Sequence, residues 1–397
     1  MERDGFVLRI TDQTAVEAPP HHEPALQEVP RPEPAGKDVK RYHRLKLLTG
    51  LIHTAFVFGF TLALVATDLS RTIEFSARGW FANDYAVLLA FAAVVGILES
   101  ILSFPLRYYS GYFLEHKYGL SNQSFGAWLW EKIKGMLVGF PLMVLLLVTL
   151  YFCLNSFGAL WWLPVGGIMF VFSILLARLA PVVIFPLFYK FKSLDESPLR
   201  ARLLVLCNKA GIAVKGLFVF NLSKTTKKAN AAFTGIGRAK RIILGDTLVA
   251  NFTDDEIETI FAHELGHQTM NHLWKMMAIG TLTTFLGLFC TALLHDASLA
   301  WFGFDARSTI AALPLLGLWL GLYSFVTAPV TNMISRAHER QADVYAVKLS
   351  GNKGAFLNAL NKLGRMNMAD NAPHPVVEFL FYSHPSLEKR IRAVGVL

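Results

Sequence analysis

The sequence predicts a predominantly α-helical membrane protein, in which about six membrane-spanning helices carry a small cytoplasmic domain of helices and strands. Two observations predict the membrane part. Of the 397 residues, 53% are hydrophobic and only 17% are charged, and several apolar runs reach about 20 residues, the length that crosses a bilayer. A third observation predicts the domain: a polar stretch of roughly 95 residues separates the fourth run from the fifth and contains strand-like segments.

The chain begins with a polar tail. Residues 1 to about 36 are rich in Pro and Glu and have no apolar periodicity, so we expect them to be disordered. They do not predict a cleaved signal peptide, because no apolar region follows Met1. A basic cluster from Lys37 to Lys46 follows and adjoins the first apolar run. We place the basic-ended tail at residues 1–44.

Six apolar runs follow, four before the polar stretch and two after it. We expect four membrane helices within residues 45–180 and two within residues 276–330. The runs lie at about 47–67, 85–106, 135–154, 159–180, 276–295 and 308–330.

The distribution of basic residues predicts the orientation of these spans. Lys and Arg crowd the tail, residues 105–134, the long polar stretch and the C-terminal region, whereas the opposite loops hold only Arg71, Arg78 and Arg307. Cytoplasmic loops carry the excess of basic residues. Both termini and the polar stretch are therefore expected in the cytoplasm, and the net charge of +9 reflects orientation and not nucleic-acid binding.

Three ionisable residues lie inside the predicted spans: His53, Glu99 and Arg178. Such residues are costly in lipid, and either they line a water-filled cavity or they pair and reach toward the helix ends. Both alternatives stay open from the sequence.

The polar stretch, placed at residues 181–275, alternates between helix and strand. Residues 197–210 have helical apolar periodicity. Strands are expected at residues 216–222, 230–234 and 241–244, the second closed by Gly235 and Gly237.

The segment Ile260–Gln268 contains a motif that is typical of metal-binding catalytic sites. His263 and His267 are four residues apart and so share one face of a helix, where both rings can reach one metal ion. Glu264, beside the first histidine, is placed to take a proton from a metal-activated water. Thr253 and Glu256 have the form of a capping box that starts this helix. The alternative is an amphipathic helix with two surface histidines.

A catalytic zinc site needs a third protein ligand, and the candidates follow the sixth run. Glu339 and Asp343 are four apart and share a helix face. Glu339 can bind the metal, and Asp343 can accept a hydrogen bond from a ligand histidine. His338 points about 100° away from Glu339 and is expected to be a bystander. The alternative for Glu339 is an ordinary surface carboxylate.

Together these patterns resemble the M48 metallopeptidases, and within them the CAAX prenyl protease type I branch. The resemblance covers about residues 98 to 392. Besides the motif at His263, it rests on segments 103–109, 115–123, 186–188, 230–237, 240–248, 335–343 and 383–391.

The resemblance implies one Zn²⁺ per chain, with Glu264 as the general base. It implies that Asp343 does not bind the metal itself but contacts a histidine that does. The implied zinc ligands are His263, His267 and Glu339. It further implies that His384 and Arg390 hold the substrate or the transition state. Substrate would lie along an edge strand that comprises Asn230, Ala231, Ala232, Phe233 and Thr234.

Members of this branch enclose a chamber within a ring of helices. The eukaryotic relatives have seven spans and this sequence has six, which leaves open whether its ring closes. The site would be shared between residues 181–275, which hold the two histidines, and the C-terminal part, residues 331–397, which holds the third ligand.

We therefore interpret the chain as an integral-membrane zinc endopeptidase with a zincin-type domain, cleaving peptides or proteins that are prenylated or membrane-embedded. One alternative is a quality-control protease of the same family, and another is a non-enzymatic transporter or zinc scaffold. An intramembrane protease of the site-2 type is disfavoured. Such a protease carries the histidine motif inside an apolar span and a metal-binding Asp-Gly motif later in the chain, whereas the only Asp-Gly pair here is Asp4-Gly5 in the tail. The expected location is the inner membrane of a bacterium or the endoplasmic reticulum of a eukaryote.

Overall fold

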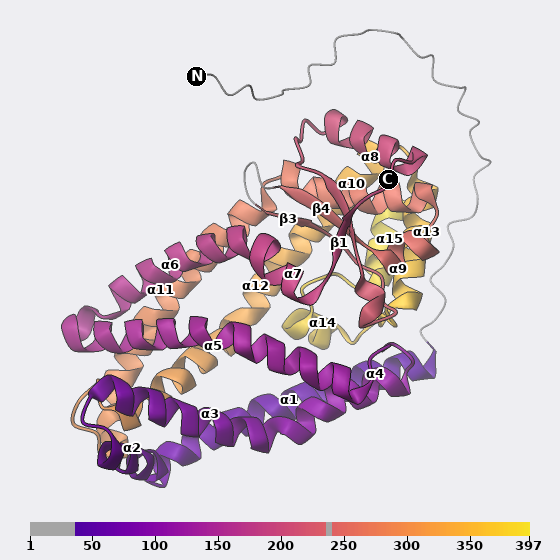
Figure 1. The fold of residues 1–397 in the computed structure, drawn as a ribbon. Helices are drawn as coiled ribbons and strands as arrows, with labels where there is room; N and C mark the ends of the chain where they lie inside the picture. Colours follow the sequence, from indigo (N-terminus) through magenta and orange to yellow (C-terminus); the bar gives the residue numbers. More distant parts are fainter. Residues whose placement is uncertain (1–35, 236–239) are drawn as a thin grey trace, which may run out of the picture.

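The computed structural model describes residues 36–235 and 240–397. The tail that we expect to be disordered lies outside these residues, apart from its end, and so does Gly237. The described chain consists mainly of helices, with one small sheet at one end of the molecule (Figure 1).

Among the described residues, six helices are long and apolar enough to cross a membrane, which confirms the predicted number of spans. Each extends beyond its apolar run, and four continue into short π- or 3₁₀-helical turns. The first three spans are α1 (Lys37–Ala66), α3 (Asp84–Tyr108) with its continuation α4 (Leu114–Lys117), and α5 (Phe125–Ser156). The other three are α6 (Trp162–Leu179) with its continuation α7 (Phe185–Phe188), α11 (His272–Leu299) and α12 (Leu313–Ser350).

In the part of the chain that the structure describes, these six helices form a ring. Helix α1 packs against α3 and α12, α11 packs against α12 and α6, and α6 packs against α5. Aromatic contacts join α5 back to α3, because Tyr85 meets Tyr151 at 5.5 Å between ring centroids and Tyr108 meets Trp128 at 6.2 Å. Figure 1 shows the helices slanting together away from the sheet.

A helix that the sequence analysis did not anticipate, α2 (Leu69–Trp80), connects the first two spans. It is amphipathic: Ile73 and Ala77 are buried, whereas Phe75 and Trp80 are more than three-quarters exposed. The sequence signal was missed because the segment is short and lies in a loop region. Helix α2 lies at the end of the ring farthest from the sheet (Figure 1).

Two of the three ionisable residues predicted inside the spans, His53 and Glu99, belong to one polar cluster. Glu99 receives hydrogen bonds from Arg107 at 2.7 and 2.8 Å and from Ser103 at 2.7 Å, and His53 lies 3.9 Å from it. This cluster joins α1 to α3 and reduces the cost of a charge among apolar helices. Arg178 lies in the last turn of α6.

The sheet has the strand order β1-β2-β4-β3. Its strands are β1 (Phe191–Ser193), β2 (Leu217–Phe220), β3 (Ala231–Thr234) and β4 (Arg241–Gly245). β2 and β4 are parallel and the other pairs are antiparallel, with Ala232 opposite Ile243. Three of the strands lie where the sequence predicts them. β1 was missed because three residues are too few to show alternation. β3 is an edge strand, as expected.

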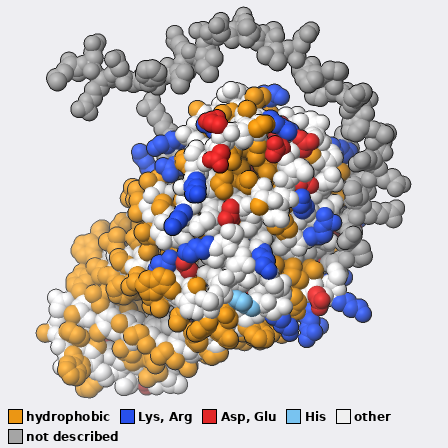
Figure 2. Space-filling view, turned by 45° about the vertical axis from the view of Figure 1, so that its right-hand side comes forward, with side chains coloured by type: hydrophobic (Ala, Val, Ile, Leu, Met, Phe, Trp, Pro, Cys, Tyr) orange, Lys and Arg blue, Asp and Glu red, His pale blue; other side chains and the backbone are white. Residues whose placement is uncertain are grey.

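Helices cover the sheet and complete a globular domain, which we define as residues 191–269 and 331–397. They are α8 (Pro198–Lys209), α9 (Asp246–Asn251), α10 (Asp254–Thr269), the end of α12, α13 (Lys353–Met366), α14 (Pro375–Phe381) and α15 (Leu387–Gly395). Their shared core includes Leu203, Leu244, Phe261 and Phe356, all fully buried. Figure 2 shows hydrophobic side chains covering the ring and charged side chains gathered on the globular domain.

Candidate metal centre

Helix α10 sets the orientation of the histidine pair. Its capping box is present: Thr253 Oγ1 accepts from the Glu256 amide at 3.3 Å, and Glu256 Oε2 accepts from the Thr253 amide at 2.9 Å. This fixes the first turn, while Ile257 and Phe261 anchor the helix in the domain core. His263 and His267 consequently lie one turn apart on one face.

Helix α12 brings Glu339 to the same place. A close approach of the two helices makes this possible, because a Cβ atom on Gly266 would lie 3.1 Å from Tyr345 and 3.2 Å from Ala342. The glycine between the two histidines therefore serves packing, since a larger side chain there would push α12 and its carboxylates away from α10.

The three donor groups converge at distances that suit a metal ion. His263 Nε2 lies 3.1 Å from His267 Nε2, and Glu339 oxygens lie 3.4 Å from each of these nitrogens. Tetrahedral zinc, with bonds of about 2.0–2.1 Å, separates its ligand atoms by about 3.4 Å. Two imidazoles and a carboxylate therefore fit zinc in both chemistry and spacing.

On the side of His263 that faces away from the other donor groups lies the carboxylate of Asp343, which forms an ion pair with Arg390. Asp343 Oδ1 lies 2.9 Å from His263 Nδ1, within hydrogen-bond distance but out of line with the ring N–H. Arg390 of α15 donates to both oxygens of Asp343, at 2.9 and 2.6 Å. The sequence analysis directed Arg390 toward substrate, and the structure adds this partner, which that analysis did not name.

Behind His267 stands a different arrangement. His272, the first residue of α11, places its Nδ1 3.0 Å from His267 Nδ1 and its Nε2 2.9 Å from Gln341 Oε1. Sequence reasoning gave neither residue a role: Gln341 was only part of a family-like segment, and a single histidine five residues after His267 is a weak signal. His338 stacks on His272 with ring centroids 4.1 Å apart and is not one of the three converging donors.

Burial and charge shift the proton affinities of the site. Burial raises the pKa of Glu264, and the neighbouring His263 and His267 oppose that rise. For His263, burial lowers the pKa, but the contacts with Asp343 and Glu339 outweigh it and raise the pKa to about 9.

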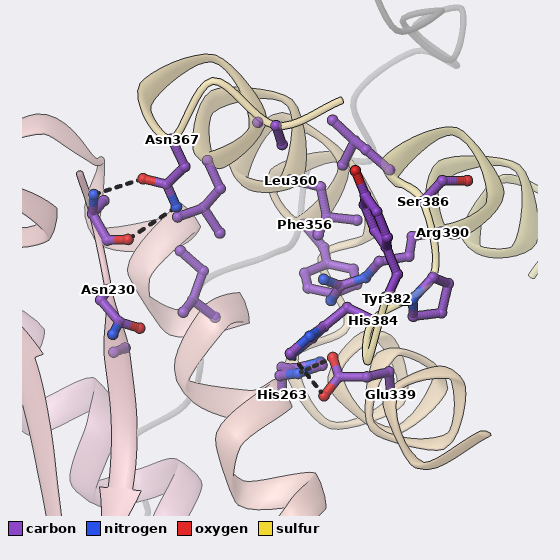
Figure 3. A pocket seen from close by; sticks show the side chains of 18 of the residues that line it. Asn230, His263, Glu339, Phe356, Leu360, Asn367, Tyr382, His384, Ser386 and Arg390 are labelled. Atoms are coloured by element: carbon purple, nitrogen blue, oxygen red, sulfur yellow. Dashed lines mark hydrogen bonds and ion pairs between the residues drawn. The ribbon is translucent and has the colours of Figure 1, made fainter. Parts of the chain in front are cut away.

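A cavity of about 520 Å³ opens beside the donor groups. One wall is the start of the edge strand, with Asn230 and Ala231, and another is apolar, with Phe356, Leu360 and Leu363. The remaining expected strand residues, Ala232, Phe233 and Thr234, do not line it. Figure 3 shows His263 and Glu339 at the floor of the cavity and Tyr382, His384 and Arg390 along one side.

The beginning of the edge strand is clamped. Asn367 accepts from the Ala229 amide at 2.9 Å and donates to the Ala229 carbonyl at 3.1 Å, as a neighbouring strand would (Figure 3). The chain is therefore held in place at Ala229, the first of three consecutive residues that line the cavity.

His384 lies on the open side of the donor groups, with its Nε2 3.4 Å from Glu339 Oε1. Its loop is held from behind, because Glu378 accepts from the Ser386 amide at 3.1 Å and Arg336 donates to the Glu378 carbonyl at 3.0 Å. Burial lowers the pKa of His384, which favours the neutral form of its ring. The loop ends where α15 begins, at Leu387, with Ser386 at the N-cap.

Comparison with known families covers nearly the whole chain. Residues 193–396 match the family described as peptidase family M48. Residues 24–190 match the family described as CAAX prenyl protease N-terminal, five membrane helices. Within the described part of that region, the structure has four spans and the short helix α2.

Individual proteins match over similar lengths. The chain is 30% identical to the uncharacterized metalloprotease YhfN of Bacillus subtilis, over 89% of this chain and 84% of that protein. It is 32% identical to CAAX prenyl protease 1 of Saccharomyces cerevisiae, over 79% of this chain and 73% of that protein. The crystal structure of S. mikatae Ste24p superposes with a TM-score of 0.80 at 26% identity, covering 91% of each chain.

Proposed function

This chain belongs to peptidase family M48 and is a membrane metalloprotease, and from that premise we propose how it binds its metal and what it cleaves. We propose that one Zn²⁺ is held by His263, His267 and Glu339. The observation that carries this proposal is the convergence of the three donor groups at 3.1–3.4 Å beside Glu264 and an open cavity.

A zinc ion in this site supplies a Lewis acid that polarises the scissile carbonyl and acidifies the attacking water. Glu264 is the general base: it takes the proton of that water and passes it to the leaving amine. Its raised pKa suits both roles, because a carboxylate with a pKa nearer to neutrality can accept a proton and release it again.

The edge strand β3 aligns the substrate. An extended peptide can add to a free strand edge through main-chain hydrogen bonds, and the cavity takes its side chains. The proposed contact runs along Asn230, Ala231, Ala232, Phe233 and Thr234, the strand that Asn367 clamps at Ala229. The scissile bond then lies between this strand and the 382–387 segment.

His384 acts on the other side of the scissile bond. Its neutral ring donates a hydrogen bond to the carbonyl oxygen as negative charge develops there, which stabilises the transition state more than the ground state. Arg390 lines the same cavity, and its cation adds to this stabilisation while its main partner is Asp343.

For the substrate we propose a protein with a prenylated C-terminal tail. The similarity to CAAX prenyl protease 1 of S. cerevisiae supports this class, and a metal site at the mouth of a ring of membrane helices suits a lipid-modified peptide. Cleavage of unmodified membrane proteins, as in quality control, is the competing function in the same family. The transporter and scaffold alternatives are not retained, because the family is one of peptidases.

The excess of Lys and Arg on the segments around the globular domain supports a cytoplasmic site. We propose that both termini lie on that side of the membrane, with α2 and residues 303–309 on the other. The membrane itself is the inner membrane in a bacterial source or the endoplasmic reticulum in a eukaryotic one.

The decisive experiment compares two quenched peptides of the same sequence, one farnesylated and one with a free cysteine. Purified protein in detergent, loaded with one equivalent of zinc, should cleave the farnesylated peptide with the higher kcat/KM, and Glu264→Gln protein should cleave neither. Equal cleavage of both peptides would contradict recognition of the prenyl group and indicate general proteolysis. Equal cleavage by the Glu264→Gln protein would remove the proposed mechanism.

A further inference from the structure

The side of His267 that faces away from the other donor groups is held by a relay of two more side chains. His267 belongs to α10, His272 to α11 and Gln341 to α12, so three helices meet at this point. The relay runs from His267 Nδ1 to His272 Nδ1 at 3.0 Å and from His272 Nε2 to Gln341 Oε1 at 2.9 Å. His272 is only 3% exposed, so water has little access to its ring.

The donor and acceptor atoms of the three side chains determine which group donates each hydrogen bond of the relay. A neutral imidazole has one N–H donor and one acceptor nitrogen. Since Gln341 Oε1 accepts from His272 Nε2, the Nδ1 of His272 has no proton and must accept. His267 then donates from Nδ1, which leaves a lone pair on the Nε2 that faces His263 and Glu339.

We propose that His272 and Gln341 are positioning residues, which hold His267 in the tautomer that binds the metal. This inference rests on the proposed metal site. The reversed relay would put a proton on His267 Nε2, where it would block the metal, so the acceptor at Gln341 decides whether this histidine can act as a ligand.

The two histidines thus have partners of different charge. His263 is backed by Asp343, an anion neutralised by Arg390. A carboxylate behind His267 would add a fourth negative charge to a site that already holds Glu264, Glu339 and Asp343. A neutral ring orients the ligand without that charge, at the cost of needing an acceptor beyond it.

The relay also connects the metal site to the membrane part. His272 begins the fifth span, directly after Asn271, whose φ is 57°. Stacking of His338 on His272 keeps the ring in the plane that the relay needs. Metal affinity therefore depends on the seating of α11 against α10 and α12.

A purely structural role for His272 is the competing explanation, because the ring fills the junction of three helices. The two explanations differ for substitutions that keep shape but change hydrogen bonding. His272→Phe keeps an aromatic ring and removes the acceptor. Gln341→Glu can only accept from His272, which favours the metal-binding tautomer, whereas Gln341→Lys can only donate, which favours the blocked one.

The test measures the zinc dissociation constant of the full-length protein in detergent by competition with a chromophoric chelator. We expect His272→Phe to weaken binding 10–100-fold, the loss typical of partners behind a metal ligand, and His338→Phe, which keeps the stacking, to have no such effect. Gln341→Lys should weaken binding by a similar factor, while Gln341→Glu binds at least as tightly as the wild type.

Variants of Gln268 are the control for the effect of the added charge alone. Gln268 follows His267 on α10 and points about 100° away from it. Gln268→Glu and Gln268→Lys introduce the same charges without entering the relay. If the variants at Gln341 differ no more than those at Gln268, or if folded His272→Phe protein binds zinc as the wild type does, the relay is wrong. A wild-type protein that fails to bind one equivalent of zinc would instead overturn the metal site itself.

Discussion

Arg390 grips both carboxylate oxygens of Asp343, and Asp343 in turn lies 2.9 Å from the Nδ1 of His263. Arg390, seven positions before Leu397, is thereby joined to the first histidine of the α10 motif through a single carboxylate. All three groups are largely buried. The ion pair therefore links the packing of α15 to the orientation of His263, a proposed metal ligand.

Breaking this pair should destabilise the protein. Arg390→Ala leaves the buried charge of Asp343 without its partner, which costs about 3–5 kcal/mol in such sites. The double variant Asp343→Asn with Arg390→Met should recover most of that loss, because no unpaired charge remains. Unfolding in detergent measures both. If Arg390→Ala keeps wild-type stability and only raises KM, the arginine serves the substrate and not Asp343.

Glu264→Gln should separate metal binding from chemistry. We expect near-stoichiometric zinc together with a loss of hydrolysis by several orders of magnitude, because the ligands remain and the proton acceptor is gone. Glu258→Gln, on the same helix and paired with Arg202, is the matched control and should keep activity. Undiminished turnover in Glu264→Gln protein would exclude Glu264 as the base.

His384→Ala should keep the fold and the metal and lower kcat by roughly 10²–10³, the loss expected for one hydrogen-bond donor to the developing oxyanion. His374, at the N-cap of α14, offers a control of the same type outside the cavity lining. Wild-type kcat/KM in the His384→Ala protein would contradict a role in catalysis and leave His384 a structural residue.

Metal binding should depend on pH through His263. In the metal-free protein its pKa is raised from 6.5 to about 9, so below pH 9 a metal ion has to displace a proton. Apparent zinc affinity should rise about tenfold per pH unit from neutrality and level off above pH 9. Chelator competition at several pH values measures this, and a flat profile would contradict it.

The same shift has the opposite effect on the stability of the metal-free protein. A folded-state pKa above the unfolded value adds stability that is complete below about pH 6.5 and is lost as the pH rises through 9. Thermal unfolding of chelator-treated protein should show this decline, and His263→Gln should remove the part that belongs to His263.

Topology can be tested with single cysteines in a background that lacks Cys153, Cys207 and Cys290. Cysteines at Ser76 and Asp305 should react with an impermeant thiol reagent added from outside, because those loops carry few basic residues. A cysteine at Lys117 should react only after permeabilisation. Labelling of position 117 from outside would reverse the proposed orientation.

Local patterns predicted most of the fold. The six apolar runs, the capping box at Thr253 and the edge strand at Ala231–Thr234 each depend on residues close in sequence, and the structure contains them all. The ends of the spans were less predictable, because helices such as α12 continue past the apolar region as amphipathic segments.

The partners behind the histidines could not be predicted in the same way. Gln341 lies 69 residues from His272, and Arg390 lies 47 residues from Asp343. No periodicity connects such positions, since their contact depends on how α11, α12 and α15 pack around α10. The sequence analysis named Arg390 and Asp343 separately but had no means to pair them, and it passed over His272 because one histidine near a motif carries little signal.

Helix α12 extends without interruption from the membrane to Ser350, over 38 residues or about 57 Å. Glu339 lies ten residues beyond Pro329, the proline inside this helix, so a bend of about 5° there would displace the carboxylate by about 1.3 Å. Bilayer thickness changes the tilt of membrane helices. We therefore expect a change in lipid chain length to reach the proposed metal site through α12, and the close contact at Gly266 to resist it by holding α12 against α10.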